Sequence, residues 1–255
     1  MRNLHRLISI LDKGVKRSGV GRKSICIVSD IRFPISIAKE DGLDYFHTPR
    51  GRAIPFSVGM KLANPDLKVI AFPGDLATIG GNHFVHGGRK NIDITVVFVN
   101  SFYYNTINGK KAPLVDRSFS PYGGDEKPFN IPFMAKACGA VYVARWTALH
   151  AEELSISISE AINKVGFSVI DLIYPQKNFY ELSEDSGEYA DLLEFYHENS
   201  EIAGGVDIKE TEILGDKKIL VGKFHESERL DFIQAYNAMQ QKMLGEKFKP
   251  YGVKQ

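Results

Sequence analysis

The chain has little of several features that define particular classes of protein. Its 255 residues include only two cysteines, too few for the disulfide frameworks that stabilise small secreted domains. Cys26 and Cys138 each lie in an apolar stretch, so we expect two buried structural thiols in a cytoplasmic protein. No run of about 18 apolar residues occurs, so no membrane-spanning helix is expected.

An excess of charge of one sign is also missing. The 32 Lys and Arg residues are balanced by 31 Asp and Glu residues, for a formal net charge of +1. This balance favours neither nucleic acid nor an anionic membrane surface as a partner. The N-terminal stretch MRNLHRLISILDKGVKR predicts an amphipathic helix rather than a secretory signal, because charges interrupt its apolar residues and no small-residue cleavage site follows.

What the chain does contain is a regular alternation of short strands and longer helices. The predicted strands are rich in Val and Ile and almost continuously apolar, as expected for strands covered on both faces. The alternation predicts an α/β fold with a mostly parallel sheet. Strands are predicted at 24–29, 67–72, 93–100, 140–145 and 167–174, and helices at 2–17, 52–63, 79–90, 129–138 and 149–165.

Two segments interrupt this alternation. Residues 101–128 form a long stretch with Pro, Gly, Tyr and charged residues, and loops of that length in compact domains are usually functional or disordered. After residue 175 the chain becomes more polar, with an acidic stretch and a final helix predicted at 226–244. We therefore expect an α/β domain at 1–175 and a C-terminal extension at 176–255 that packs on the domain or on a partner subunit.

The stretch FPGDLATIGGN at 72–82 suggests a site for a magnesium diphosphate. Gly74 and Asp75 follow one predicted strand, and Asn100 and Ser101 end the next, so all four lie at the carboxyl edge where open α/β sheets bind ligands. The following helix would present its N-terminal N–H groups to an anion. Asp75 with an oxygen from Asn100 or Ser101 would suit Mg²⁺. A simpler alternative is that the Gly-Asp turn only caps the helix.

Basic and imidazole side chains lie near the same edge. Arg50 and Arg52, in TPRGRAI, precede a predicted helix and could bind phosphate or carboxylate, or could pair with surface acids. His83 and His86 are spaced i, i+3 on a predicted helix. No third ligand with suitable spacing is evident, which favours ordinary polar or core histidines over a metal site.

Three stretches together resemble one family. They are HTPRGRAIPFSVGMKLANPDLKVIAFPGD, LATIGGNHFVHGGRKNIDITVVFVN and PFNIPFMAKACGAVYVARWT, and the family is the thiamine-diphosphate-binding β subunit of 2-oxoacid:ferredoxin oxidoreductases, the group that includes 2-oxoglutarate synthase. The resemblance implies a doubly wound thiamine-diphosphate fold and a hetero-oligomer with an α subunit. It also implies oxidative decarboxylation of a 2-oxoacid to acyl-CoA, with electrons passing through an iron–sulfur cluster to ferredoxin.

The positions that hold the family's iron–sulfur cluster differ in this chain. The Cys-Pro-Gly-Cys motif of the family has no counterpart in the sequence, whose first residues are MRNLHRL. Phe33 and Tyr174 stand where the resemblance places the third and fourth cysteine ligands, and neither Cys26 nor Cys138 aligns with a ligand. Because such a cluster is held by cysteine thiolates, no iron–sulfur cluster is expected.

The thiamine diphosphate positions are also altered. The family's His-Gly-Arg reads Arg50-Gly51-Arg52, its Gly-Asp-Gly-Asp turn reads only Gly74-Asp75, and its Asn-Asn pair reads Asn100-Ser101. The glycine-rich loop over the diphosphate reads Tyr104 to Lys110, and its glycines, which allow close backbone approach, are largely replaced. Carried over by position, the cofactor contacts would be Arg50, Gly51, Arg52, Gly74, Asp75, Asn100, Tyr104 and Lys110, and a working magnesium site would use Asp75, Ser101 and the carbonyl of Tyr103.

These departures predict a degenerate β subunit, free of thiamine diphosphate and Mg²⁺ and kept for subunit assembly or regulation. One alternative is an active, divergent β subunit that binds Mg²⁺–thiamine diphosphate but lacks its own cluster. Another is a new anion site formed by Arg50, Arg52 and Lys110.

Overall fold

A single mixed sheet is the centre of the molecule. The computed structural model describes residues 2–30, 43–74, 80–100, 129–174, 194, 196–213 and 218–252, with side chains from residue 6 onward. Within these residues the eight-stranded sheet has the order β2-β1-β3-β4-β6-β5-β8-β7. Its strands are β1 Ile25–Asp30, β2 Asp44–Thr48, β3 Lys68–Phe72, β4 Thr95–Asn100, β5 Tyr142–Thr147, β6 Ser168–Ile173, β7 Ser200–Ile202 and β8 Ile219–Glu226.

The sheet is parallel except where β8 joins it. Strands β2, β1, β3, β4, β6 and β5 pair in parallel, whereas β8 runs antiparallel to β5 and carries β7 at the outer edge. Every residue of β1, β5 and β6 is buried, which explains their continuous apolar sequences. The predicted mostly parallel α/β sheet is confirmed.

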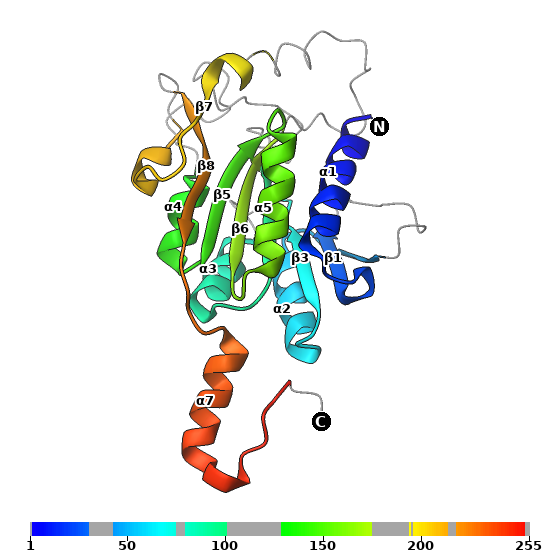
Figure 1. The fold of residues 1–255 in the computed structure, drawn as a ribbon, viewed down its shortest axis with the longest axis vertical. Coiled ribbons are helices and arrows are strands. Elements are labelled where there is room, and N and C mark those ends of the chain that lie inside the picture. Colours follow the sequence, from blue (N-terminus) through cyan, green and yellow to red (C-terminus); the bar gives the residue numbers. More distant parts are fainter. Residues whose placement is uncertain are drawn as a thin grey trace.

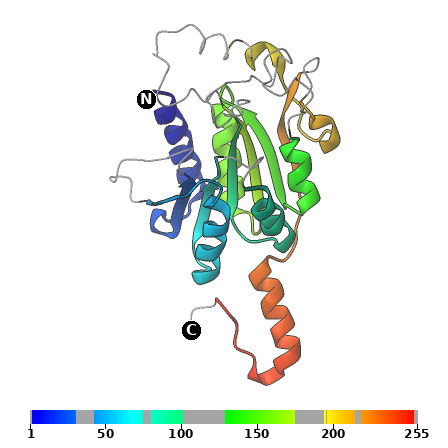
Figure 2. The same cartoon turned by 180° about the vertical axis from the view of Figure 1, so that it is seen from behind.

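Helices cover both faces of the sheet, as Figures 1 and 2 show from opposite sides. Helices α1 (Arg2–Ser18) and α5 (Ala151–Asn163) pack on one face, and α2 (Ala53–Ala63), α3 (Gly81–Lys90) and α4 (Ile131–Cys138) on the other. Helix α1 approaches α5 closely at Gly14, where a Cβ atom would lie 2.7 Å from Ile158 Cγ2. No helix in the described ranges combines the length and apolar character needed to cross a membrane.

The two cysteines differ in burial. Cys26 is buried in β1, where burial raises the pKa of its thiol to about 12. Cys138 ends α4 and is only half-buried, contrary to the expectation of two buried thiols, although partial burial still raises its pKa. A thiol with a raised pKa is a poor nucleophile at neutral pH, which agrees with the expectation of structural rather than reactive cysteines.

The final helix, α7 (Phe232–Leu244), begins six residues later than the sequence predicted. Residues up to Glu226 belong to β8 instead, because their backbone pairs with β5. The helix starts after Asp231, whose side chain accepts a hydrogen bond from the backbone N–H of Gln234 in a capping box. The start of α7 is therefore set by this capping box rather than by the spacing of apolar residues.

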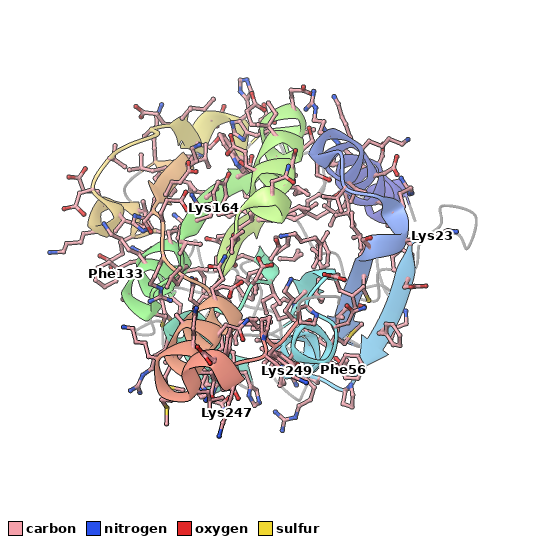
Figure 3. All side chains as sticks on the ribbon, turned by 60° about the horizontal axis from the view of Figure 1, so that its bottom comes forward. Lys23, Phe56, Phe133, Lys164, Lys247 and Lys249 are labelled. Atoms are coloured by element: carbon pink, nitrogen blue, oxygen red, sulfur yellow. The ribbon has the colours of Figure 1, made fainter. Side chains whose placement is uncertain are left out.

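Helix α7 and residues 245–252 form a C-terminal arm that extends from one end of the sheet (Figure 1). The arm returns on itself, with the side chain of Asn237 bonded to both backbone groups of Tyr251. The hydroxyl of Tyr251 donates to the carbonyl oxygen of Leu62, which ties the arm to the end of α2. Figure 3 looks onto this end of the molecule, with Lys247 and Lys249 on the arm.

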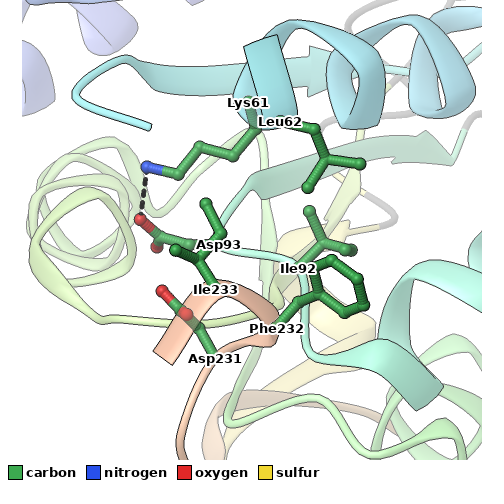
Figure 4. A pocket seen from close by; sticks show the side chains of 7 residues that line it. All are labelled: Lys61, Leu62, Ile92, Asp93, Asp231, Phe232 and Ile233. Atoms are coloured by element: carbon green, nitrogen blue, oxygen red, sulfur yellow. Dashed lines mark ion pairs between the residues drawn. The ribbon is translucent and has the colours of Figure 1, made fainter. Parts of the chain in front are cut away.

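The base of the arm lies beside a buried ion pair. Lys61, Leu62, Ile92, Asp93, Asp231, Phe232 and Ile233 line a narrow crevice there (Figure 4). Lys61 Nζ lies 2.7 Å from Asp93 Oδ2 and also donates to the carbonyl oxygens of Pro65 and Leu67. With three acceptors the buried ammonium is satisfied within the chain, so the pair supports the fold rather than a ligand.

Asn91 joins the base of the arm to the sheet. It adopts a left-handed conformation, with φ of 51°, directly after α3. Its side chain accepts from the N–H of Phe167 at 2.9 Å and donates to the carbonyl oxygens of Arg229 and Leu230. Because Asn91 is 1% exposed, water cannot replace these bonds.

We expect Asn91→Ala to lower the free energy of unfolding by about 2–3 kcal/mol, because buried backbone groups lose their partners. Asn91→Gly should be less harmful, since glycine accepts positive φ without strain. Asn64→Ala, at an exposed site, is the matched control and should change stability by less than about 0.5 kcal/mol. Urea unfolding measures all three, and equal stabilities for Asn91→Ala and Asn64→Ala would contradict this role.

Candidate functional site

Asp30 is the centre of the carboxyl edge at the β2 side of the sheet. It ends β1, the strand between β2 and β3, and is fully buried. Its Oδ2 accepts hydrogen bonds from the backbone N–H groups of Gly51 and Gly74, each at 3.0 Å. These two glycines belong to the turns that follow β2 and β3, so one carboxyl group joins three consecutive strand ends.

Two of the predicted cofactor contacts therefore come together, but around a side chain that the sequence analysis did not single out. Gly51 has a φ of 70°, a conformation that few other residues adopt, and closes a turn in which the N–H of Arg52 donates to the carbonyl oxygen of Pro49. The available signal was an acidic residue at the end of the mostly apolar strand ICIVSD.

Arg52 and His83 form a polar pair across the first turns of two helices. Arg52 is the residue before α2, and His83 lies in the first turn of α3. The Nη1 atom of Arg52 is 3.0 Å from Nε2 of His83, and because a guanidinium can only donate, the imidazole nitrogen accepts. The pKa of His83 is lowered by the partial burial of its ring and by the nearby charges of Arg52 and His86. The ring is thus held neutral beside a permanent cation.

This pairing removes the ring nitrogen that a metal ion would need. Nε2 of His83 already accepts a hydrogen bond from Arg52, and a metal ligand must offer a free lone pair. Within the described ranges, no three His, Cys, Asp or Glu side chains converge in a way that could hold a metal ion. Arg50, in the same turn as Gly51, is half-buried.

Asn100, at the end of β4, interacts with the interior of the sheet. Its carbonyl oxygen accepts from the N–H of Tyr174, and its side chain is hydrogen-bonded to Asp171 on the neighbouring β6. Asp171 Oδ2 in turn lies 2.7 Å from Nε of Arg145 on β5, with both side chains fully buried. Burial raises the pKa of Asp171, and Arg145 and Asn100 oppose that rise.

Arg145 of this ion pair also contacts the segment that contains Thr211. Nη1 of Arg145 donates to the carbonyl oxygen of Thr211 at 2.6 Å. The hydroxyl oxygen of Thr211 lies 2.7 Å from the carbonyl oxygen of Ile208 and 2.9 Å from Oδ1 of Asn130, and its one proton is shared between these two acceptors. Asn130 also caps α4 by accepting from the N–H of Phe133. Polar contacts through the buried side chains of Arg145, Asp171 and Thr211 therefore link two half-buried residues, Asn100 at the end of β4 and Asn130 directly before α4.

The remaining predicted contacts fall outside the described residues. Asp75, Ser101, Tyr103, Tyr104 and Lys110 are in this group, as is Phe33. The convergence of Asp75 and Ser101 on one metal ion, and of Arg50 with Lys110 on an anion, therefore stay predictions.

Replacing Arg52 by Gln should raise the pKa of His83, because the positive charge that opposes protonation of the ring is removed. The titration of imidazole C–H resonances by NMR measures this directly. His225 is an internal control, since its pKa is lowered by burial, Lys136 and Lys164 rather than by Arg52. An unchanged His83 titration in Arg52→Gln would show that the two side chains do not interact in solution.

Arg145→Met should destabilise the chain by about 3–5 kcal/mol, because it leaves the buried Asp171 without its counter-ion. Among the described residues, Nη2 of Arg145 and Oδ1 of Asp171 have no hydrogen-bond partner, so within this part of the chain the pair is incompletely satisfied. We therefore expect the double variant Arg145→Met/Asp171→Leu to recover most of the lost stability. Chemical denaturation of the three proteins tests this, and a single variant as stable as wild type would contradict it.

Comparison with known proteins assigns the chain to a family. Residues 21–172 match the model of the thiamine pyrophosphate enzyme C-terminal TPP binding domain. The chain is 39% identical over 210 residues to the 2-oxoglutarate synthase subunit KorB of Methanocaldococcus jannaschii, covering 80% of this chain and 77% of that protein. It is 36% identical over 233 residues to the KorB subunit of Archaeoglobus fulgidus, covering 88% and 84% respectively.

A solved structure shares the fold. It is a 2-oxoglutarate:ferredoxin oxidoreductase from Magnetococcus marinus, which superposes with a TM-score of 0.71 at 24% identity. The superposition covers 92% of this chain and 84% of that one. The family model, the identities to the archaeal subunits and the shared fold agree. The chain belongs to the family of thiamine-diphosphate-binding β subunits of 2-oxoacid:ferredoxin oxidoreductases.

Proposed function

We propose that this chain is an assembly subunit of a 2-oxoacid:ferredoxin oxidoreductase complex, with a degenerate cofactor site that does not bind Mg²⁺–thiamine diphosphate. Its partner is the α subunit of the complex, through which it is associated with ferredoxin, and the complex is cytoplasmic. It holds no iron–sulfur cluster of its own, because the cysteine ligands of the family are replaced at Phe33 and Tyr174.

The observation that carries this proposal is the bonding of Asp30. A diphosphate is bound in proteins largely by backbone N–H groups at turns and helix N-termini. Here the N–H groups of Gly51 and Gly74, two positions that the family resemblance assigns to the cofactor, already donate to a buried carboxyl group. An acidic group at that place would also repel a diphosphate. The described residues therefore do not fit the cofactor.

The other described contacts support the same function. Arg52 donates to His83, and the Asn100 side chain is bonded to Asp171. The sheet and the helices on both of its faces are nevertheless intact, with two well-packed apolar layers. A scaffold that is preserved while the positions assigned to the cofactor bond to other residues of the chain is expected when the selected property is assembly with another chain.

The alternative is an active, divergent β subunit that binds Mg²⁺–thiamine diphosphate and receives its electron route from another subunit. The identities of 39% and 36% to KorB subunits, each over more than three quarters of both chains, favour this alternative. In that case Asp75 and Ser101 would converge on one Mg²⁺ ion.

Calorimetric titration with thiamine diphosphate and excess Mg²⁺ separates the two functions. The purified chain and its complex with the co-expressed α subunit are titrated in parallel. We expect no binding heat in either preparation, because the backbone donors are already occupied. Micromolar binding in either preparation would instead establish the active subunit and make ferredoxin reduction the next assay.

Asp75→Ala is the companion variant. An assembly subunit should keep its α-subunit partner in a pull-down after this change, and loss of the partner would count against the proposal. In the active alternative the same variant should abolish Mg²⁺-dependent binding of thiamine diphosphate, because a metal carboxylate is lost.

A further inference from the structure

We infer that the carboxyl group of Asp30 occupies a position at which an anion from solution would otherwise bind. Because its side chain fills that position, this one residue prevents oxyanions from binding at this edge of the sheet. The inference rests on the proposed function and names the residue responsible for it. Asp30 is a specificity-determining residue in this account, because its side chain fills the place of a ligand.

The geometry resembles the binding of a ligand more than an ordinary strand end. A single oxygen, Oδ2 of Asp30, receives two backbone N–H groups at 3.0 Å each. The donors are 21 and 44 residues away along the chain and come from the turns after two different strands. Charge-assisted bonds of this kind are stronger than neutral ones, and they offset the cost of burying a carboxylate.

The two turns have the features of an anion site. Gly51 is buried with positive φ, and α2 begins two residues after it at Ala53. Gly74 lies two residues after the end of β3, on the other side of β1. Backbone N–H groups in turns that lead into helices are the usual donors to phosphate and carboxylate oxygens. The exposed guanidinium of Arg52 adds positive charge on the solvent side of the same turn.

Removal of the Asp30 carboxyl group should therefore leave a vacant site that small oxyanions can fill. In Asp30→Ala the missing volume is that of a formate ion, and in Asp30→Gly it is that of an acetate ion. Asp30→Asn is the matched control, because it fills the same volume and keeps one acceptor oxygen, while a neutral amide replaces the carboxyl group.

The experiment measures the midpoint of thermal unfolding of each protein in sodium formate, sodium acetate or sodium chloride at equal ionic strength. We expect formate to raise the midpoint of Asp30→Ala by about 2–4 °C relative to chloride, since an anion that binds only the folded state stabilises it. Acetate should do the same for Asp30→Gly. Wild type and Asp30→Asn should respond equally to all three salts.

An equal response of all four proteins to each salt would overturn the inference. If Asp30→Ala and Asp30→Gly fail to fold in every salt, the inference is tested on the wild-type chain instead. Its midpoint should be the same in sodium pyrophosphate as in sodium sulfate at matched ionic strength, and a rise specific to pyrophosphate would overturn the inference.

These outcomes are separate from failure of the proposed function. Binding of thiamine diphosphate by the wild-type complex would contradict the assembly function whatever the variants do. Absence of that binding, together with no rescue by formate or acetate, would leave the assembly function standing and remove only the role of Asp30.

Discussion

The carboxyl edge of this sheet depends on two hydrogen bonds to one buried oxygen. Oδ2 of Asp30 holds the turns after β2 and β3 against the end of β1, the strand between them. In parallel sheets this edge is where ligands bind, because the N-termini of the following helices are directed towards it. Here the chain supplies its own acceptor at that place, which holds the two turns together.

A second buried interaction connects the strands in the middle of the sheet near the same edge. The pair of Arg145 and Asp171 joins β5 to β6, and its further bonds reach Asn100 at the end of β4 and Thr211 before β8. Such a pair stabilises little on its own, because desolvation offsets the attraction, but it allows few alternative arrangements. The edge is therefore held by interior polar groups at two points, and the helices that cover the sheet pack around this framework.

Much of the fold could be predicted from the sequence, whereas the bonding at the site could not. The five inner parallel strands were predicted because burial on both faces requires continuous apolar residues. Strand β2 was missed because most of its residues are exposed at the edge, and β8 because its pairing with β5 is antiparallel and distant in sequence. Asp30 was missed for a similar reason: nothing local to residue 30 indicates donors at Gly51 and Gly74. Family resemblance identified those glycines, but hydrogen-bond partners depend on tertiary structure.

The central claim is that the edge is closed from within by Asp30. A crystal structure of the chain grown with excess Mg²⁺ and thiamine diphosphate tests this claim most directly. We expect Oδ2 of Asp30 to stay within hydrogen-bonding distance of the N–H groups of both Gly51 and Gly74, with no diphosphate density beside them. Density for a diphosphate on those N–H groups, with the Asp30 side chain displaced, would contradict it.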